Sequence, residues 1–338
     1  MIFDGLFASK GVRLLTIDRP AAGGSSPVPI RHRLAASHAA LLAILKHHDI
    51  TSVHILAHSN GLVYSLYSIL QLLPPPDAPP PPVRILSWSL TSPWVPPWHS
   101  GSRPLNAARW LPAYATSSLG TVISNLQAIT GTVNDWRPAL PKPLATWWAA
   151  PDAAAAATAP LGAGEKALER ELTPREDLDA WLERNAHRAD HYRGFGRGFF
   201  PARASEVVAE WVAAEGLGAW GDEALVSLRK GEGVAWGWGQ DPETGIEDEQ
   251  RLYENGFRAV QEALARRAQE LPVTVAFGEQ DALIPPLGRA FLKKLLVENL
   301  EMVGRRDWLE VEGAGHDDLL AREMAILPVV ERAVPPPA

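Results

Sequence analysis

Hydrophobic residues in the first part of the chain alternate between strand-like and helix-like patterns. Runs rich in branched residues at 12–17, 52–57 and 83–90 predict β-strands. Between them, apolar residues recur at helical spacing over 34–46 and 61–73. Strands that alternate with helices pair in parallel, because each helix carries the chain back across the sheet. The pattern therefore predicts an α/β fold with a mostly parallel sheet.

The same alternation returns near the end of the chain. Strands are predicted at 273–278 and 308–311, and helices at 287–299 and 317–333. The two stretches of alternation belong to one sheet domain if the sequence between them is an insertion. We therefore expect one α/β domain that a long insertion interrupts.

The intervening sequence has helical patterns without clear strand alternation. These patterns cover 165–170, 177–185, 206–214 and 248–267. We predict a helical cap at 98–267, between a first part of the core at 1–97 and a second part at 268–338.

Composition narrows the class of protein. The chain has 338 residues, of which 46% are hydrophobic and 21% are charged, which is an ordinary globular balance. A net charge of -7 without a basic stripe argues against a nucleic-acid partner. The absence of cysteine excludes disulfides, thiolate catalysis and cysteine-based zinc sites. No signal-peptide pattern opens the sequence, and the apolar stretch 62–73 is too short to span a bilayer, so we expect a cytoplasmic protein with no transmembrane segment.

The segment 57–61, Ala-His-Ser-Asn-Gly, lies where a predicted strand gives way to a helix. It is close to the G-x-S-x-G nucleophile elbow, in which small residues relieve crowding around a sharp turn. Ser59 is the candidate nucleophile, and the backbone N–H of Asn60 is the candidate donor to a developing oxyanion. The alternative is that Ser59 merely caps the following helix.

A serine nucleophile needs a general base, and the base needs a carboxylate that orients it. His316 follows the last predicted strand in a glycine-rich loop, and Asp281 follows the strand at 273–278 by one turn. Both positions lie at the carboxyl edge of the sheet, where α/β folds collect functional groups. Ser59, Asp281 and His316 also have the chain order that an α/β-hydrolase triad requires.

Other histidines fit the base less well. His47 and His48 lie at a helix end, His54 lies within a strand, and His58 is expected to face away from the cleft. His187 and His191 share a helical face, and they are solvated residues more often than metal ligands. No metal or organic cofactor is implied.

These motifs together resemble the α/β-hydrolase superfamily, in its large branch with a serine nucleophile and a helical cap after the sixth strand. The segment 11–20 resembles the family's fourth strand and the start of its D-x-P-G-x-G-x-S loop, with Ala21 in place of a glycine. The segments 278–285 and 313–316 resemble the G-x-x-D-x-x-x-P acid motif and the G-x-G-H motif. The resemblance covers most of 11–97 and 268–330.

The resemblance also implies parts that this sequence does not supply. In the family, three strands precede the one that 12–17 resembles, and the third ends in a His-Gly loop that gives the second oxyanion donor. No residue here can be assigned that role, so we expect an N-terminally incomplete sheet. One hypothesis is that the sequence is an incomplete version of a longer enzyme, and the other is a natural short form with little activity.

The implied function is hydrolysis of an ester-type acyl bond in a small, moderately apolar substrate, through an acyl-enzyme. Trp94, Trp236 and Trp238 are candidates to line the substrate pocket, although tryptophan is also a routine core residue. Amide cleavage, acyl transfer and carbon–carbon bond hydrolysis stay open. The alternative from another class is a catalytically impaired hydrolase-fold protein that acts as a binding module. The expected partner is a small-molecule substrate, and the sequence does not indicate an oligomeric state.

Overall fold

The structure is a computed structural model, and its described part is built on a parallel sheet. It describes residues 7, 11–73, 79, 81–117, 218–230, 236, 238, 251–281, 283–312 and 314–320. Within these ranges one sheet has the strand order β1-β2-β3-β4. The strands are β1 (Ser52–His58), β2 (Arg84–Thr91), β3 (Val273–Gly278) and β4 (Trp308–Val311). The strands predicted at 52–57, 83–90, 273–278 and 308–311 are confirmed.

Every strand pair in this sheet is parallel. His58 of β1 pairs with Thr91 of β2, and Thr91 pairs with Ala276 of β3. Gly278, the last residue of β3, pairs with Val311, the last residue of β4. The carboxyl ends of the strands therefore meet at one edge of the sheet, as the α/β prediction requires.

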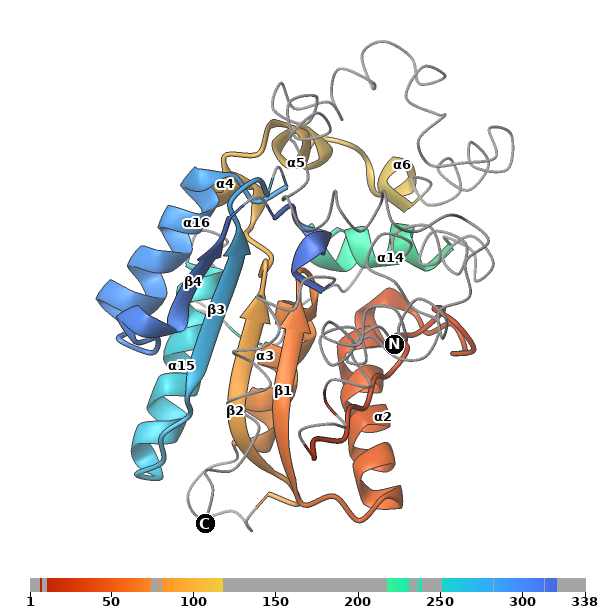
Figure 1. Cartoon of the computed structure of the whole chain (residues 1–338). Coiled ribbons are helices and arrows are strands. Elements are labelled where there is room, and N and C mark those ends of the chain that lie inside the picture. The colour runs from red at the N-terminus through yellow and green to blue at the C-terminus, as the bar shows by residue number, and fades with distance from the viewer. Residues whose placement is uncertain are drawn as a thin grey trace, which may run out of the picture.

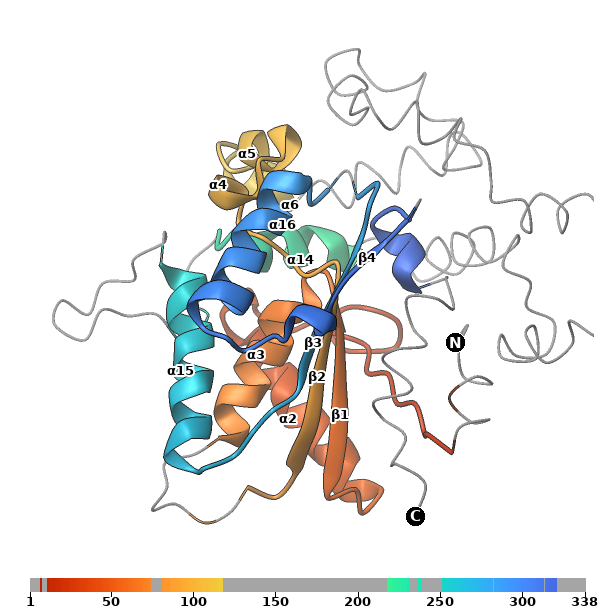
Figure 2. The same ribbon diagram turned by 60° about the vertical axis from the view of Figure 1, so that its left-hand side comes forward.

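The helices that alternate with these strands agree closely with the sequence pattern. The long ones are α2 (Arg33–His47), α3 (Gly61–Leu72), α15 (Leu252–Arg266) and α16 (Pro286–Lys293), which continues in a π-helical turn, η3 (Lys294–Asn299). The helices predicted at 34–46, 61–73 and 287–299 are confirmed, and α15 lies within the pattern predicted at 248–267. Figure 2 shows α3 and α15 together on one face of the sheet, and α2 contacts α3.

Shorter helical segments gather mainly at the carboxyl edge. They are η1 (Ile30–His32), α4 (Pro97–Ser100), α5 (Arg103–Ala108), α6 (Ala113–Ser117), α14 (Gly218–Ser227), η4 (Arg305–Asp307) and η5 (Asp317–Leu320). Figure 1 shows α4, α5, α6 and α14 at the end of the sheet where the strand arrows point. The start of the predicted 317–333 helix is the 3-10 turn η5, and the remainder of that prediction lies outside the described residues.

The hydrophobic core lies between the sheet and α3 with α15. Every residue of β3 is buried, as expected for a strand covered on both faces. The indole of Trp88 in β2 is fully buried, with its ring centroid 5.5 Å from that of Phe257 in α15. Its Nε1 donates to the hydroxyl of Ser65 in α3, at 3.1 Å, so the one polar atom of the ring is satisfied. This packing fixes α3, and with it the turn that leads from β1 into α3.

The strand predicted at 12–17 is wrong. These residues belong to no ladder, and Leu14, Leu15 and Ile17 are only partly buried. A β-strand is stabilised by backbone hydrogen bonds to a neighbour, and in the described part of the chain no strand lies beside this segment. Branched residues favour the β conformation, but a strand forms only when its backbone pairs with a neighbouring strand.

Much of the predicted insertion lies outside the described residues, including the helices predicted at 165–170, 177–185 and 206–214. The cap boundaries at 98 and 267 stay a prediction. Two described helices within that range have clear neighbours, since α14 contacts α6 and α15 contacts α3. Among the described helices, none is long and apolar enough to cross a membrane.

Candidate active site

Ser59 occupies a sharp turn between β1 and α3. Its φ is 51°, in the left-handed region, whereas Asn60 already has the helical φ of -58°. Such a conformation costs a non-glycine residue about 1–3 kcal/mol, and the surrounding structure must hold it. The Ser59 amide donates to the Thr91 carbonyl at 3.0 Å, and the Ser59 carbonyl accepts from the amides of Leu62 and Trp94. These bonds hold the turn against both β2 and α3.

Small residues, Ala57 and Gly61, flank the turn on either side. A Cβ on Gly61 would lie 3.5 Å from the Cβ of Ala57 and 3.3 Å from Nη2 of Arg19. The methyl group of Ala57 therefore lies at an ordinary contact distance from position 61, and the tighter neighbour there is the guanidinium of Arg19.

The hydroxyl of Ser59, the imidazole of His316 and the carboxylate of Asp281 form one chain of hydrogen bonds. His316 Nε2 is 2.9 Å from Ser59 Oγ, and His316 Nδ1 is 2.9 Å from Asp281 Oδ2. A carboxylate accepts only, so Nδ1 carries the proton and Nε2 is left to accept from the serine hydroxyl. The structure thus brings together the three side chains that the sequence analysis selected, from the ends of β1, β3 and β4.

The loop after β3 fixes the carboxylate of Asp281. The side chain of Asp281 has no exposed surface. Its Oδ1 accepts from the backbone amides of Leu283, at 3.0 Å, and Ile284, at 2.8 Å. From α16, Nη1 of Arg289 donates to the carbonyl of Gly278 at 2.6 Å. One carboxylate oxygen is therefore held by backbone donors while the other is left for the imidazole.

The loops that carry Asp281 and His316 are also bonded to each other. The amide of Gln280 donates to the carbonyl of Ala314 at 2.9 Å, and the amide of Glu279 donates to that of Val311 at 2.9 Å. A Cβ on Gly278 would collide with the carbonyl oxygens of Ala314 and Gly315. Gly278, the first residue of the acid motif, thus lets the loop that carries His316 approach β3 closely.

His58 lies nearer to the site than the sequence suggested. It was expected to face away, but its ring centroid is 5.1 Å from that of His316. Its Nδ1 is 3.1 Å from Thr91 Oγ1. The alternation of a strand predicts opposite faces for neighbours, and the left-handed turn at Ser59 breaks that alternation. His54 instead bonds to Ser87, with 2.8 Å between Nδ1 and Oγ.

Two other histidines that the sequence analysis considered, His47 and His48, lie at the end of α2, where their ring centroids are 4.9 Å apart. His187 and His191 lie outside the described residues. Among the described residues, no cluster of three or more His, Asp or Glu side chains is arranged to hold a metal ion.

The three tryptophans proposed for the substrate pocket have different positions. Trp94 donates its backbone amide to the Ser59 carbonyl at 3.0 Å, and its side chain is buried in the main core cluster. Trp236 is fully buried, and its Nε1 donates to the Val226 carbonyl at 2.9 Å. Trp238 packs against Trp236, with ring centroids 5.6 Å apart. Core packing, which the sequence left open for these residues, describes all three side chains, and only the backbone of Trp94 is bonded to Ser59.

Sequence analysis missed a cluster of charged residues beside the elbow, centred on Glu223. Glu223 of α14 accepts hydrogen bonds from the side chains of Asn60, Tyr64, Arg19 and Arg33. Burial opposes ionisation of Glu223, but the charge of Arg19 and the hydrogen bonds of Arg33 and Tyr64 outweigh it and lower the pKa of the carboxyl. Because Glu223 and Asn60 are separated by 163 residues in sequence, no local motif could reveal the contact.

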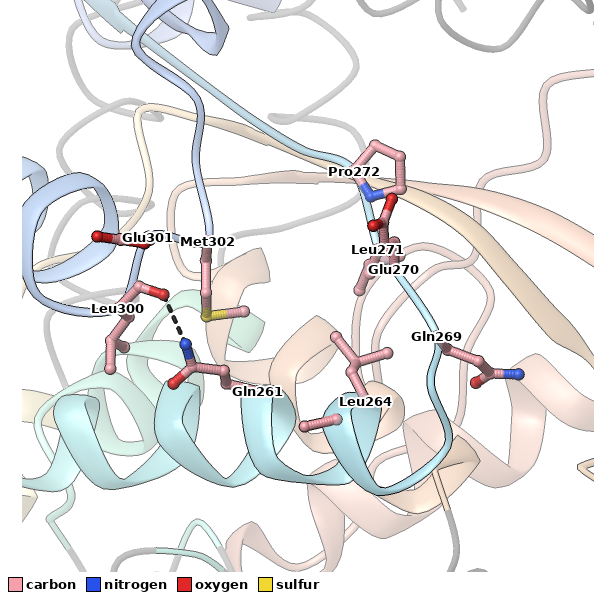
Figure 3. Close-up of a pocket in the computed structure, with 10 residues that line it drawn as sticks. Gln261, Leu264, Gln269, Glu270, Leu271, Pro272, Leu300, Glu301 and Met302 are labelled. Carbon is pink, nitrogen blue, oxygen red and sulfur yellow. Dashed lines mark hydrogen bonds between the residues drawn. The ribbon is translucent and has the colours of Figure 1, made fainter.

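A surface hollow of about 430 Å³ lies away from this site. It is lined mainly by the end of α15 and by residues 269–272 and 300–302, which include Gln261, Leu264, Pro272 and Met302 (Figure 3). Residue 272 precedes β3, so the hollow lies at the amino end of that strand, and the triad lies at the carboxyl ends. The hollow is therefore not part of the candidate active site.

The elbow, the strand order and the position of the three side chains together decide the architecture. The described core has the α/β-hydrolase fold. No family model matches the sequence, and no curated protein matches it. The fold assignment rests on the chain's own sheet and elbow.

Solved structures similar to this hydrolase-fold core share little sequence with it. MGS-M2, an α/β-hydrolase enzyme from a Medee basin deep-sea metagenome library, is 11% identical, with a TM-score of 0.46 over 95% of this chain and 79% of that one. A bromoperoxidase from Bacillus anthracis is 13% identical, with a TM-score of 0.46 over 98% and 86%. A monoacylglycerol lipase from Paleococcus ferrophilus is 14% identical, with a TM-score of 0.38 over 98% and 87%.

Replacing Gly278 by alanine should destabilise the protein. The added methyl group would collide with backbone carbonyls of the histidine loop, and overpacking of this kind costs about 1–3 kcal/mol. Gly24→Ala is the matched control, since a Cβ there meets open space and should change the free energy of unfolding by less than about 0.5 kcal/mol. Urea unfolding measures both values. Equal values for the two variants would mean that the close approach at Gly278 is not required.

The charged cluster predicts a stability that depends on pH. Because the pKa of Glu223 is lowered in the folded protein, its contribution is complete above the usual value of 4.5 and is lost as pH falls through the folded value. Glu223→Gln should therefore lower the free energy of unfolding at neutral pH, by about 1–3 kcal/mol, because the buried Arg33 loses one of its two carboxylate partners. The difference from wild type should shrink in acid, where Glu223 is itself neutral. A difference that stays constant down to well below the usual glutamate pKa would contradict the ion-pair assignment.

Proposed function

We propose that this protein is a serine hydrolase that cleaves an ester-type acyl bond of a small, moderately apolar substrate. One observation carries the proposal. Ser59, at a left-handed turn, is joined through His316 to the buried carboxylate of Asp281 by two hydrogen bonds of 2.9 Å. A hydroxyl, an imidazole and a carboxylate in this order form the arrangement that activates a serine for acyl transfer.

The first half-reaction forms an acyl-enzyme. Ser59 Oγ attacks the carbonyl carbon while His316 Nε2 takes the hydroxyl proton, and Asp281 stabilises the imidazolium that results. The carbonyl oxygen becomes an oxyanion, which accepts from the backbone N–H of Asn60 at the start of α3. The tetrahedral intermediate collapses as His316 returns the proton to the departing alkoxide, and the alcohol leaves.

The second half-reaction releases the acid. A water molecule loses a proton to His316 Nε2 and attacks the acyl carbon. The new oxyanion uses the same donor, and collapse of the intermediate returns the proton from His316 to Ser59 Oγ. The cycle ends with the free carboxylic acid and the original triad.

The substrate preference rests mainly on Trp94. The backbone amide of Trp94 is bonded to the Ser59 carbonyl, and its indole is buried in the core cluster that packs against the elbow. The side chains of Trp236 and Trp238 belong to the same cluster, so they support the proposed acyl pocket through core packing.

A second candidate is a hydrolase-fold protein with impaired catalysis that acts as a binding module. It is favoured by the oxyanion site, for which the Asn60 amide is the donor we assign among the described residues. Loss of one oxyanion donor typically costs about 10²–10³ in rate. A covalent probe separates this candidate from an active hydrolase.

A fluorophosphonate should label the wild-type protein at Ser59, because the probe requires an activated serine. Ser59→Ala should abolish labelling, and Asp281→Asn should slow ester turnover by about 10⁴, since it favours the wrong imidazole tautomer. Labelling is read by intact mass, and the modified residue by peptide mapping. Ser92→Ala is a control at a buried serine outside the triad, and it should leave labelling intact. Folded wild type that takes up no label at neutral pH would contradict a working nucleophile and favour the binding module.

A series of p-nitrophenyl esters tests the proposed apolar acyl group. The specificity constant kcat/KM should rise with acyl chain length over the shorter members, because each buried methylene contributes about 0.8 kcal/mol. Trp94→Ala should flatten this dependence more than it lowers turnover of the acetate ester. A flat series for wild type would argue against an apolar acyl site.

A further inference from the structure

Glu223 lies where three segments of the chain meet. It belongs to α14, which lies far from the elbow in sequence, and Figure 1 shows α14 over the carboxyl end of β1. Its partners come from the turn after residues 12–17, from the first residue of α2 and from the first turns of α3. The side chain is only 18% exposed.

Each carboxylate oxygen of Glu223 accepts two hydrogen bonds. Oε2 accepts from Arg19 Nη1, at 2.6 Å, and from Asn60 Nδ2, at 2.9 Å. Oε1 accepts from Arg33 Nη2 and from the Tyr64 hydroxyl, both at 2.7 Å. A carboxylate has about four acceptor sites, so its hydrogen-bonding capacity is filled and its orientation is fixed.

Charge in the cluster is balanced. Arg33 is fully buried, and it also donates to Asp222 at 3.0 Å and to the carbonyl of Pro20 at 2.7 Å. Arg19 lies over the ring of Tyr64, with its guanidinium carbon 4.5 Å from the ring centroid. Two guanidinium groups thus face two carboxylates, and no net charge is left that would recruit a ligand.

Two of the donors to Glu223 sit on successive turns at the start of α3. Asn60 precedes the helix and Tyr64 lies four residues later, so both project from the same side of it. The side chain of Asn60 is therefore anchored to Glu223. The backbone N–H of the same residue is the one that we assign to the developing oxyanion. A displacement of about 1 Å at such a donor can cost about 10² in rate.

We propose that Glu223 is a positioning residue, which holds Asn60 so that its backbone N–H is aimed at the oxyanion. This inference rests on the proposed hydrolase function. The helix α14 must then be docked on the elbow for full activity. Lys230, just after α14, donates to the carbonyls of Ala108 and Leu111, so α14 is tied to the α5 region as well.

Glu223→Gln tests the proposal, with Asp222→Asn as its matched control. Glutamine keeps the length of the side chain but presents an amide group to donors, so it cannot accept all four bonds. The control substitution removes a neighbouring charge on the same helix and from the same arginine, without touching the elbow. On p-nitrophenyl acetate, Glu223→Gln should lower kcat by about tenfold to a hundredfold with KM within about twofold. Asp222→Asn should stay within about threefold of wild type in both constants.

Equal kinetic constants for the two variants would overturn the proposal. A rise in KM with unchanged kcat would overturn it too, because that pattern belongs to substrate binding. A merely structural role would lower the amount of folded protein and leave kcat per labelled serine unchanged. Turnover is therefore normalised to fluorophosphonate-reactive sites.

Asn60→Ala gives a second test, which does not depend on the folding of Glu223→Gln. It keeps the backbone N–H and all charges of the cluster but removes the link from Nδ2 to Glu223. We expect a similar loss of kcat, and an unchanged kcat would overturn the proposal.

Amide hydrogen exchange separates this inference from the proposed function. Peptides that cover residues 57–64 should exchange faster in Glu223→Gln than in Asp222→Asn, whether or not the protein turns over esters. An unlabelled wild type would count against the hydrolase function. Unchanged exchange at 57–64 would count against the positioning role of Glu223.

Discussion

Ser59 keeps its left-handed backbone because hydrogen bonds tie the residue to β2 and to α3 at once. Its amide is bonded to Thr91, and its carbonyl accepts from Leu62 and Trp94. A φ of 51° costs a non-glycine residue about 1–3 kcal/mol of conformational free energy, which the surrounding contacts must offset. In return, the serine hydroxyl projects from the sheet edge toward His316. Core packing of α3 against β2 and α15 is thus a requirement of the site as well as of the fold.

The parallel pairing of β3 with β4 also brings Asp281 and His316 together. Since Gly278 and Val311 pair at the ends of β3 and β4, the loops that follow them start side by side. Their mutual hydrogen bonds set the distance between Asp281 and His316, and Gly278 allows the close contact. Asp281 and His316 are therefore placed by strand register and by the absence of a side chain at Gly278.

Local sequence patterns predicted the parts of this molecule that depend on near neighbours. The strands, the helices beside them and the three residues of the proposed triad each follow a short motif, and each motif reflects a local need for space or a turn. The segment 12–17 failed because a strand requires a partner, which composition does not specify. His58 was misplaced because the turn at Ser59 changes the direction of the chain. Glu223 could not be found, because its contacts join residues far apart in sequence, and an acidic residue in a helix has no local signature of burial.

Stability alone gives a weak reason for the Glu223 cluster. Taking a carboxylate and two guanidinium groups out of water costs several kcal/mol per ion, and apolar residues of similar volume are often as stabilising in such places. Apolar residues cannot fix the orientation of a neighbouring polar group. Four donors around one carboxylate fix its orientation, and the orientation is transmitted to Asn60 by a bond of 2.9 Å. A cluster whose net contribution to folding is small, but whose geometry is strict, suits the positioning role that we propose for Glu223, in which the aim of a single N–H sets the rate.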